Sequence, residues 1–102
     1  MSIISPTFVR PNINKRNNVV ELFEQMKGIY DYYNVSSKIV EVIEGNNIGC
    51  LGLIRSYSNL SSLASILLNL RENNEFQEIK LKVCEREFGE ITTNGQIWLT
   101  VF

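Results

Sequence analysis

The clearest pattern in the sequence is an apolar stripe in the segment Lys15–Tyr33. Apolar residues recur there at spacings of three and four, which places them on one face of a helix. The residues of this face are Val19, Phe23, Met26, Tyr30 and Tyr33. Asn18 followed by Glu21 resembles a capping box, and Asn34 is a suitable stop. Glycine inside a helix costs about 1 kcal/mol relative to alanine, so we expect Gly28 to mark a close contact with another backbone.

Segments rich in β-branched residues predict strands on both sides of this helix. Ser2–Arg10 forms the first, although Pro6 lacks an N–H group and therefore predicts an edge or bulged strand. Ser37–Glu44 and Ile48–Tyr57 follow the helix, and the short turn between them predicts an antiparallel hairpin. The second of these strands shows no polar alternation before Arg55, so we expect both of its faces to be covered.

A second helical region follows the hairpin. Asn59 is placed to cap a helix that ends near Arg71. Its apolar face consists of Leu60, Leu63, Leu67 and Leu70. Asn74 is placed to cap a further helix. The apolar face of that helix consists of Phe76, Ile79, Val83 and Cys84. Strict alternation in Ile79–Val83 predicts a strand instead. Residues 75–87 are therefore open between a helix and a strand. We favour the helix because their charged side chains share the face opposite the apolar one.

The chain closes with a turn at Thr93-Asn94-Gly95 and a strong strand at Gln96–Phe102. The predicted order is strand, helix, strand, strand, helix with a second helical segment, strand. This is the βαββαβ plan of a ferredoxin-like fold, an α+β class with an antiparallel sheet and helices on one face. We expect residues 1–102 to form one such domain. Because the helices cover only one face of the sheet, we expect the other face to pair with a second copy in a homodimer.

Composition fits a globular chain, with 44% hydrophobic and 21% charged residues. No apolar run reaches the roughly 18 residues of a membrane helix. The first residues also lack the order of a signal peptide, so we expect a cytoplasmic protein with no membrane partner. The formal net charge is −1 and the basic residues are scattered, which argues against nucleic acid as a partner. Cys50 and Cys84 are too few for a disulfide framework, and we expect both to be reduced and buried.

The absence of histidine excludes several kinds of chemistry. It removes Ser-His-Asp and Cys-His nucleophile systems, histidine metal sites and a proximal histidine for haem. Asp31 is the only aspartate, so neither a paired-aspartate site nor a calcium loop is available. Glu41 and Glu44 are three apart in a predicted strand and point to opposite faces, which argues against an acid/base pair. We therefore expect no metal and no cofactor.

The layout resembles that of the dimeric α/β-barrel superfamily, in which two ferredoxin-like sheets pair face to face. The likeness depends on element order, on length and on the segment SYSNLSSLASILLNLRENNEFQEI, where a hairpin strand leads into an L-x-x-L helix, a break and a second short helix. Relatives of this kind include small monooxygenases of antibiotic biosynthesis, haem-degrading enzymes and many proteins of unknown role. The resemblance implies a ligand cavity between the sheet and the helices, and it leaves the function open.

The strands and the first helix supply the lining of such a cavity. The candidate ligand-binding residues are Tyr30, Tyr33, Arg55, Tyr57 and Trp98. An arginine beside tyrosine and tryptophan can bind an aromatic or acidic small molecule through charge and stacking. The alternative is that these aromatic side chains belong to the core and that Arg55 is a surface residue closing its strand.

The function favoured by these patterns is the binding of a small apolar or aromatic molecule by a homodimer, without catalysis. A cofactor-independent monooxygenase of the antibiotic-biosynthesis type is the enzymatic alternative, with Trp98 at its site. A third hypothesis is an interaction module that pairs with other chains of the same fold. The sequence assigns no catalytic residue and names no substrate.

Overall fold

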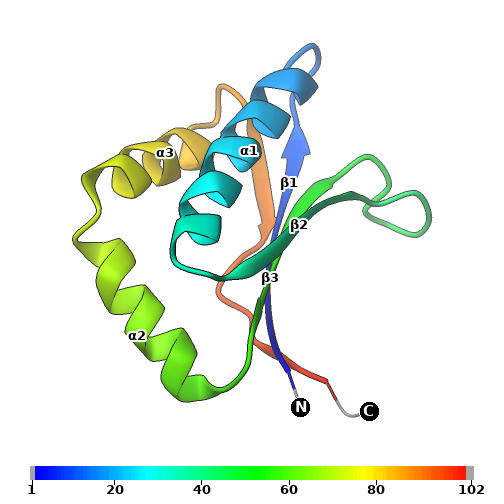
Figure 1. Cartoon of the computed structure of the whole chain (residues 1–102). Coiled ribbons are helices and arrows are strands. Elements are labelled where there is room, and N and C mark those ends of the chain that lie inside the picture. The colour runs from blue at the N-terminus through cyan, green and yellow to red at the C-terminus, as the bar shows by residue number, and fades with distance from the viewer. Residues whose placement is uncertain (1, 101–102) are drawn as a thin grey trace.

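A computed structural model of the chain describes residues 2–100. Within that range one antiparallel sheet of five strands carries three helices on one face (Figure 1). In chain order the elements are β1 (Ile3–Pro11), α1 (Arg16–Tyr32), β2 (Ser36–Glu41), β3 (Leu51–Tyr57), α2 (Leu60–Arg71), α3 (Asn74–Cys84), β4 (Gly89–Thr93) and β5 (Trp98–Leu99). The predicted α+β class with an antiparallel sheet is confirmed.

The strands lie side by side in the order β2-β3-β1-β4, and β5 pairs with β1 beyond the end of β4. The hairpin predicted from the two Ile- and Val-rich segments is confirmed, since β2 and β3 pair antiparallel from Ser36 opposite Ser56 to Glu41 opposite Leu51. Compared with the expected βαββαβ plan, the observed order contains the additional helix α3 and the short strand β5. The strand predicted at residues 96–102 is reduced to β5 within the described range, and residues 101–102 lie outside it.

Pro6 lies in a central strand, so of the two alternatives predicted from it the edge strand is wrong, whereas the bulged strand agrees with a register irregularity in β1. On one side β1 pairs with β3 along residues 3–9. On the other side it pairs with β4 from Phe8 onwards and with β5 at Ile3 and Ile4. Residues 5–7 therefore face an interruption on that side, where no partner strand requires the N–H group that proline lacks. The register against β4 shifts two residues after Pro6, between Phe8 and Val9.

Helix α1 packs the predicted stripe against the sheet. Its buried residues are Val19, Leu22, Phe23, Met26, Ile29 and Tyr30. The helix begins at Arg16 with no side-chain cap, so the capping box at Asn18 is wrong. It ends as predicted next to Asn34, which adopts a φ of 61°. Gly28 is exposed, and a Cβ atom there would have no neighbour within 4 Å, so the close backbone contact expected at this glycine is absent.

Residues 74–84 form a helix, which settles the choice between helix and strand. The exposed Leu81 gives the physical reason: strict alternation requires its side chain on the same face as Ile79 and Val83, yet it is 68% exposed while both of those residues are buried. Asn73 Oδ1 accepts a hydrogen bond from Phe76 N at 2.9 Å, so the cap lies one residue before the predicted one.

Helix α2 has the predicted bounds and the predicted cap. Asn59 Oδ1 accepts a hydrogen bond from Ser62 N at 2.8 Å, which satisfies one free donor at the N-terminus of the helix. Only Leu63 and Leu70 of its apolar face are buried. Leu67 and Leu60 remain exposed, so α2 is packed less completely against the sheet than α1.

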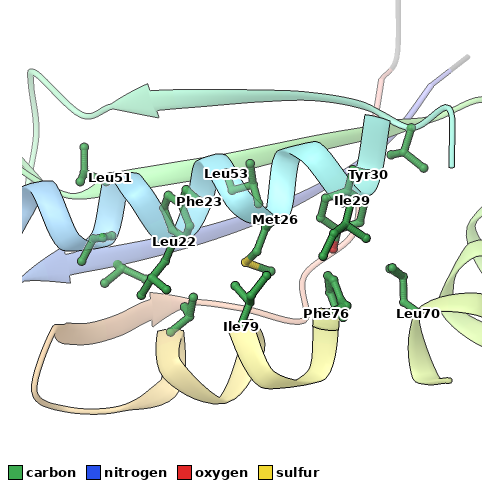
Figure 2. Close-up of a cluster of buried hydrophobic side chains, with 14 of the residues drawn as sticks. Leu22, Phe23, Met26, Ile29, Tyr30, Leu51, Leu53, Leu70, Phe76 and Ile79 are labelled. Carbon is green, nitrogen blue, oxygen red and sulfur yellow. The ribbon is translucent and has the colours of Figure 1, made fainter. Parts of the chain in front are cut away.

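The core lies between α1, the sheet and α3 (Figure 2). Phe23 and Leu53 are fully buried where α1 crosses β3. Met26 and Ile29 point from α1 toward Ile79 and Phe76 of α3 (Figure 2). Burial of a side chain of this size contributes about 1.5–3 kcal/mol. The shared core holds α3 beside α1.

Two further expectations have different outcomes. Cys50 is buried as expected, but Cys84 is exposed because it is the last residue of α3. The turn predicted at residues 93–95 is found in part: Thr93 still belongs to β4, and the chain bends at Gly95, which adopts a φ of 78°. In residues 2–100 no helix combines the length and apolar character needed to cross a membrane.

Candidate functional site

A cavity of about 440 Å³ lies between the helix-facing side of the sheet and helices α2 and α3. Its apolar lining comes mostly from the three helices and consists of Met26, Leu63, Leu67, Leu70, Phe76, Val83, Cys84, Ile91 and Ile97, with Gly95 beside them. Its polar lining consists of Ser5, Thr7, Tyr30, Arg55, Tyr57, Arg71, Gln77, Lys80, Asn94 and Gln96. Ligand pockets typically measure about 300–1,000 Å³ and combine apolar walls with a few convergent polar groups. The cavity has the dimensions and composition of such a pocket.

Arg55 points into this cavity because of strand alternation. Leu51 and Leu53 of β3 face the helices and are buried, so Arg55 and Tyr57 follow on the same side. The side chain of Arg55 is only 6% exposed. The interpretation of Arg55 as a surface residue closing its strand is therefore wrong, since the strand continues with the helix-facing Tyr57.

Hydroxyl groups of the neighbouring strand hold the guanidinium. Arg55 Nη2 donates to Thr7 Oγ1 at 2.7 Å and to Ser5 Oγ at 3.2 Å. Arg55 Cζ also lies 5.5 Å from the ring centroid of Tyr30, within the range of a cation–π contact. These contacts orient the guanidinium group but supply no negative charge to balance it.

Tyr30 and Tyr57 bring two phenols to the same cavity. Burial raises the pKa of Tyr30, and the nearby Arg55 opposes that rise. Burial, together with the neighbouring Tyr30, raises the pKa of Tyr57 to about 12, again with Arg55 acting in the opposite direction. Both phenols are therefore neutral at physiological pH and available as hydrogen-bond donors. The Tyr30 ring also packs edge-on against Phe76, with centroids 5.6 Å apart.

The five residues predicted from the sequence do not all meet. Tyr30, Arg55 and Tyr57 line the cavity together. Tyr33 instead lines a second hollow of about 510 Å³ between the end of α1 and α2, where its hydroxyl accepts a hydrogen bond from Asn73 Nδ2 at 3.3 Å. Trp98 lines neither space, is 46% exposed and donates from Nε1 to Gln96 Oε1 at 2.9 Å.

Sequence reasoning missed Ser5 and Thr7, the two residues that hold Arg55. The signal was available, because the odd-numbered residues of β1 share a face and Ile3 and Val9 on that face belong to the core. A polar pair between two core positions on one strand face indicates a buried polar site. Asn94 was also missed; its Oδ1 accepts from Thr7 Oγ1 at 3.4 Å, but it follows β4 in an irregular segment that alternation does not place.

The second hollow has a different character from the cavity. It is lined mainly by serines, six in number, and its described lining includes no charged side chain. Within residues 2–100 no group of three histidine, cysteine, aspartate or glutamate side chains is arranged to hold a metal ion. The cavity around Arg55 is therefore the better candidate for a binding site.

Solved structures share this architecture over nearly the whole chain. A NIPSNAP family protein from Agrobacterium tumefaciens is similar to this chain with 15% identity and a TM-score of 0.70. The match covers 100% of this chain and 96% of that protein's chain. Rv0793 from Mycobacterium tuberculosis matches 100% over 97% of its own chain, at 12% identity and a TM-score of 0.66. An uncharacterised NIPSNAP-like domain protein from Burkholderia xenovorans matches 97% over 84% of its own chain, at 18% identity and a TM-score of 0.64.

These identities show a shared fold. The resemblance expected from the layout is supported at that level, because the NIPSNAP proteins found here have an antiparallel sheet with helices in the same arrangement. No family model matches the sequence, and a comparison with curated proteins finds no match. Any statement about function therefore depends on the residues of the cavity.

Proposed function

We propose that this protein is a small-molecule-binding domain whose ligand occupies the cavity between the sheet and helices α2 and α3. The observation that carries the proposal is the combination of an apolar lining with the convergent polar groups of Arg55, Thr7, Tyr30 and Tyr57. The polar groups are fixed by the sheet and by α1, whereas one wall is the incompletely buried α2. An apolar wall with a few fixed polar groups at one end suits the binding of a small molecule.

The proposal includes a homodimer formed through the face of the sheet opposite the helices. Alternation places Ile4 and Phe8 of β1, Val40 of β2 and Ile54 of β3 on that face, and none of them belongs to the core cluster. The exposed cation Lys38 lies on the same face beside Ile54. Trp98 pairs with Ile4 and extends the same surface, which we call the open face. An apolar sheet face of this kind is usually buried against another layer, and a second copy supplies a matching one.

Gly52 makes room for an aromatic ring on the open face. The ring of Phe8 lies against Gly52, where a Cβ atom would come within 2.5 Å of Phe8 Cε1. Val40 is also close to this position, at 2.9 Å from such a Cβ atom. Side chains of this kind interdigitate when two sheets pack face to face.

The monooxygenase alternative depended on Trp98 lying beside the substrate. Trp98 instead lies on β5, paired with Ile4 and outside the lining of the cavity. With the motivating residue elsewhere, we do not propose that activity.

The test is a titration with the neutral fluorescent probe N-phenyl-1-naphthylamine, whose emission rises in an apolar site. Leu67 and Leu68 of α2 are similarly exposed, at 53% and 58%, but only Leu67 lines the cavity. We expect Leu67→Glu to weaken probe binding at least fivefold and Leu68→Glu to leave it unchanged. Glutamate preserves helix propensity, so the two variants form a matched pair. Equal binding by both variants places the probe elsewhere, and the absence of probe binding to the wild-type protein contradicts the proposal.

A further inference from the structure

Arg55 is a buried cation that lacks a carboxylate partner in the described part of the chain. The ion pairs of residues 2–100 join Lys15 to Glu87, Arg16 to Glu41 and Lys27 to Asp31, and none of these side chains is buried. Charged side chains are rarely buried to this extent unless they are paired. The two hydroxyls bonded to Arg55 are neutral, so they satisfy hydrogen bonds without balancing the charge.

The guanidinium also has unused donors. Arginine carries five N–H groups, and the bonds to Thr7 and Ser5 both come from Nη2. Since Arg55 lines the cavity, the remaining donors are available to a group inside it. A carboxylate fits such a fork with two parallel hydrogen bonds.

The charge of the whole lining has the same sign. Its described residues include three cations, Arg55, Arg71 and Lys80, and neither aspartate nor glutamate. The chain as a whole has 11 acidic and 10 basic residues, so its composition does not favour basic residues at this surface. Low-dielectric walls around such a cluster concentrate its field on an anion.

The rest of the lining limits the form of that anion. Apolar side chains of α1, α2 and α3 make up most of the apolar part of the wall, including Met26, Leu63, Leu70 and Phe76. They suit a hydrocarbon body. Of the three cations in the lining only Arg55 is buried, because Arg71 and Lys80 are exposed to solvent. One buried guanidinium balances one negative charge, so a second charge on the same head group would be desolvated without a buried partner. The head group that matches is a carboxylate.

We propose that the ligand is an amphipathic organic monocarboxylate, with its head group paired to Arg55 and its hydrocarbon part against the helices; this inference depends on the proposed function of the cavity. Ser5 and Thr7 act as positioning residues that hold the guanidinium toward the ligand. Tyr30 and Tyr57 line the same cavity and can donate hydrogen bonds as neutral phenols.

The test compares octanoate with octan-1-ol, a neutral molecule of the same chain length, by calorimetric titration of the wild-type protein. We expect octanoate to bind at least tenfold more tightly than octan-1-ol. Octyl phosphate is included to separate a carboxylate site from a site for doubly charged head groups, and we expect it to bind more weakly than octanoate.

Two variants connect the difference to the buried arginine. We expect Arg55→Met, an apolar replacement of similar length, to remove the preference for octanoate while octan-1-ol still binds. Arg10→Met removes one exposed positive charge outside the cavity and should keep the preference. Circular dichroism confirms that each variant is folded, and the wild-type comparison does not depend on either of them.

Each result has one meaning. Equal affinity for octanoate and octan-1-ol overturns the carboxylate inference and leaves the proposed cavity function intact. Tighter binding of octyl phosphate than of octanoate overturns the choice of head group. If neither octanoate nor octan-1-ol binds, and the neutral probe also fails to bind, the proposed function is wrong and this inference is wrong with it.

Discussion

Arg55 and Thr7 come from neighbouring strands and meet inside the cavity, with Arg55 Nη2 2.7 Å from Thr7 Oγ1. The register sets this contact, because Thr7 lies opposite Leu53 and is therefore a diagonal neighbour of Arg55 on the helix-facing side. A threonine hydroxyl at this distance orients the guanidinium without neutralising it. The pairing of β1 with β3 thus sets the position of the positive charge in the site.

Thr7→Val tests how much this contact contributes to stability. Valine keeps the shape of threonine but removes the acceptor, and hydrogen bonds to charged groups contribute about 1.5–3 kcal/mol. We expect the free energy of unfolding, measured with urea, to fall by about 2 kcal/mol. Ser5→Ala is the comparison, because its longer contact of 3.2 Å should contribute less. A smaller loss for Thr7→Val than for Ser5→Ala contradicts the ranking of the two contacts.

Gly28 and Gly52 should respond to alanine in opposite directions. Gly28 is helical and exposed with free space around it, so alanine should raise the free energy of unfolding by about 1 kcal/mol. Gly52 lies under Phe8, and alanine there forces the ring or the strand to shift, at a cost of about 1–3 kcal/mol. Urea unfolding of the two variants measures both changes. Equal effects of the same sign would mean that the contact with Phe8 does not constrain Gly52.

The raised pKa of Tyr57 predicts a loss of stability at high pH. Its pKa rises from 10.0 to about 12 on folding, so the unfolded chain loses the phenolic proton first. The contribution of Tyr57 is complete below pH 10 and is lost as the pH rises through about 12, which means that the free energy of unfolding falls across this window. Tyr57→Phe should flatten that fall in urea titrations at increasing pH. Tyr32→Phe removes an exposed phenol and serves as the control.

Among the described residues, the buried side-chain oxygen without a hydrogen-bond partner is Ser37 Oγ. An unsatisfied buried hydroxyl costs about 1–3 kcal/mol. We expect Ser37→Ala to raise the free energy of unfolding by about 1 kcal/mol. Ser36→Ala, at an exposed position of the same strand, corrects for the strand propensity of alanine. If both changes destabilise the protein equally, Ser37 Oγ is satisfied in solution.

The local elements follow from the sequence because each has a short-range cause. The stripe that defines α1 and the Asn59 cap depend on residues within a few positions of one another, and both are found. Pro6 shows where this reasoning stops. Its place in a central strand depends on the interruption between β4 and β5, which lie about 90 residues further along the chain. No local pattern reports such a distant pairing.

The residues of the candidate site also differ in whether a local pattern predicts them. Arg55 and Tyr57 follow from alternation within β3, and Tyr30 from the helical stripe. Trp98 is a candidate for the site because it lies in the predicted closing strand, residues 96–102. Within the described residues that strand is only Trp98–Leu99, and it meets β1 with Trp98 opposite Ile4 on the open face. A shift of one residue in register exchanges the two faces of a strand, and only the pairing determines it.

Ile54→Lys tests the proposed homodimer. Ile54 lies on β3 in the middle of the open face, opposite Pro6 and beside Lys38. Its replacement puts a second positive charge next to that of Lys38, and two stacked sheets cannot bury this pair of like charges without cost. We expect the wild-type protein to sediment with twice the chain mass of 11.7 kDa and Ile54→Lys to sediment as the monomer.

The control for this experiment is Leu81→Lys, which replaces an exposed leucine on α3, on the helical side of the sheet, and should leave the dimer intact. Octanoate binding separates the two parts of the proposal, because the cavity lies on the helix-facing side and its described lining comes from one chain. A monomeric wild-type protein contradicts the pairing through the open face. If Ile54→Lys dissociates the dimer and octanoate binding persists, the site is complete within a single subunit; if binding is lost together with the dimer, the partner stabilises the sheet on which Arg55 and Thr7 are held.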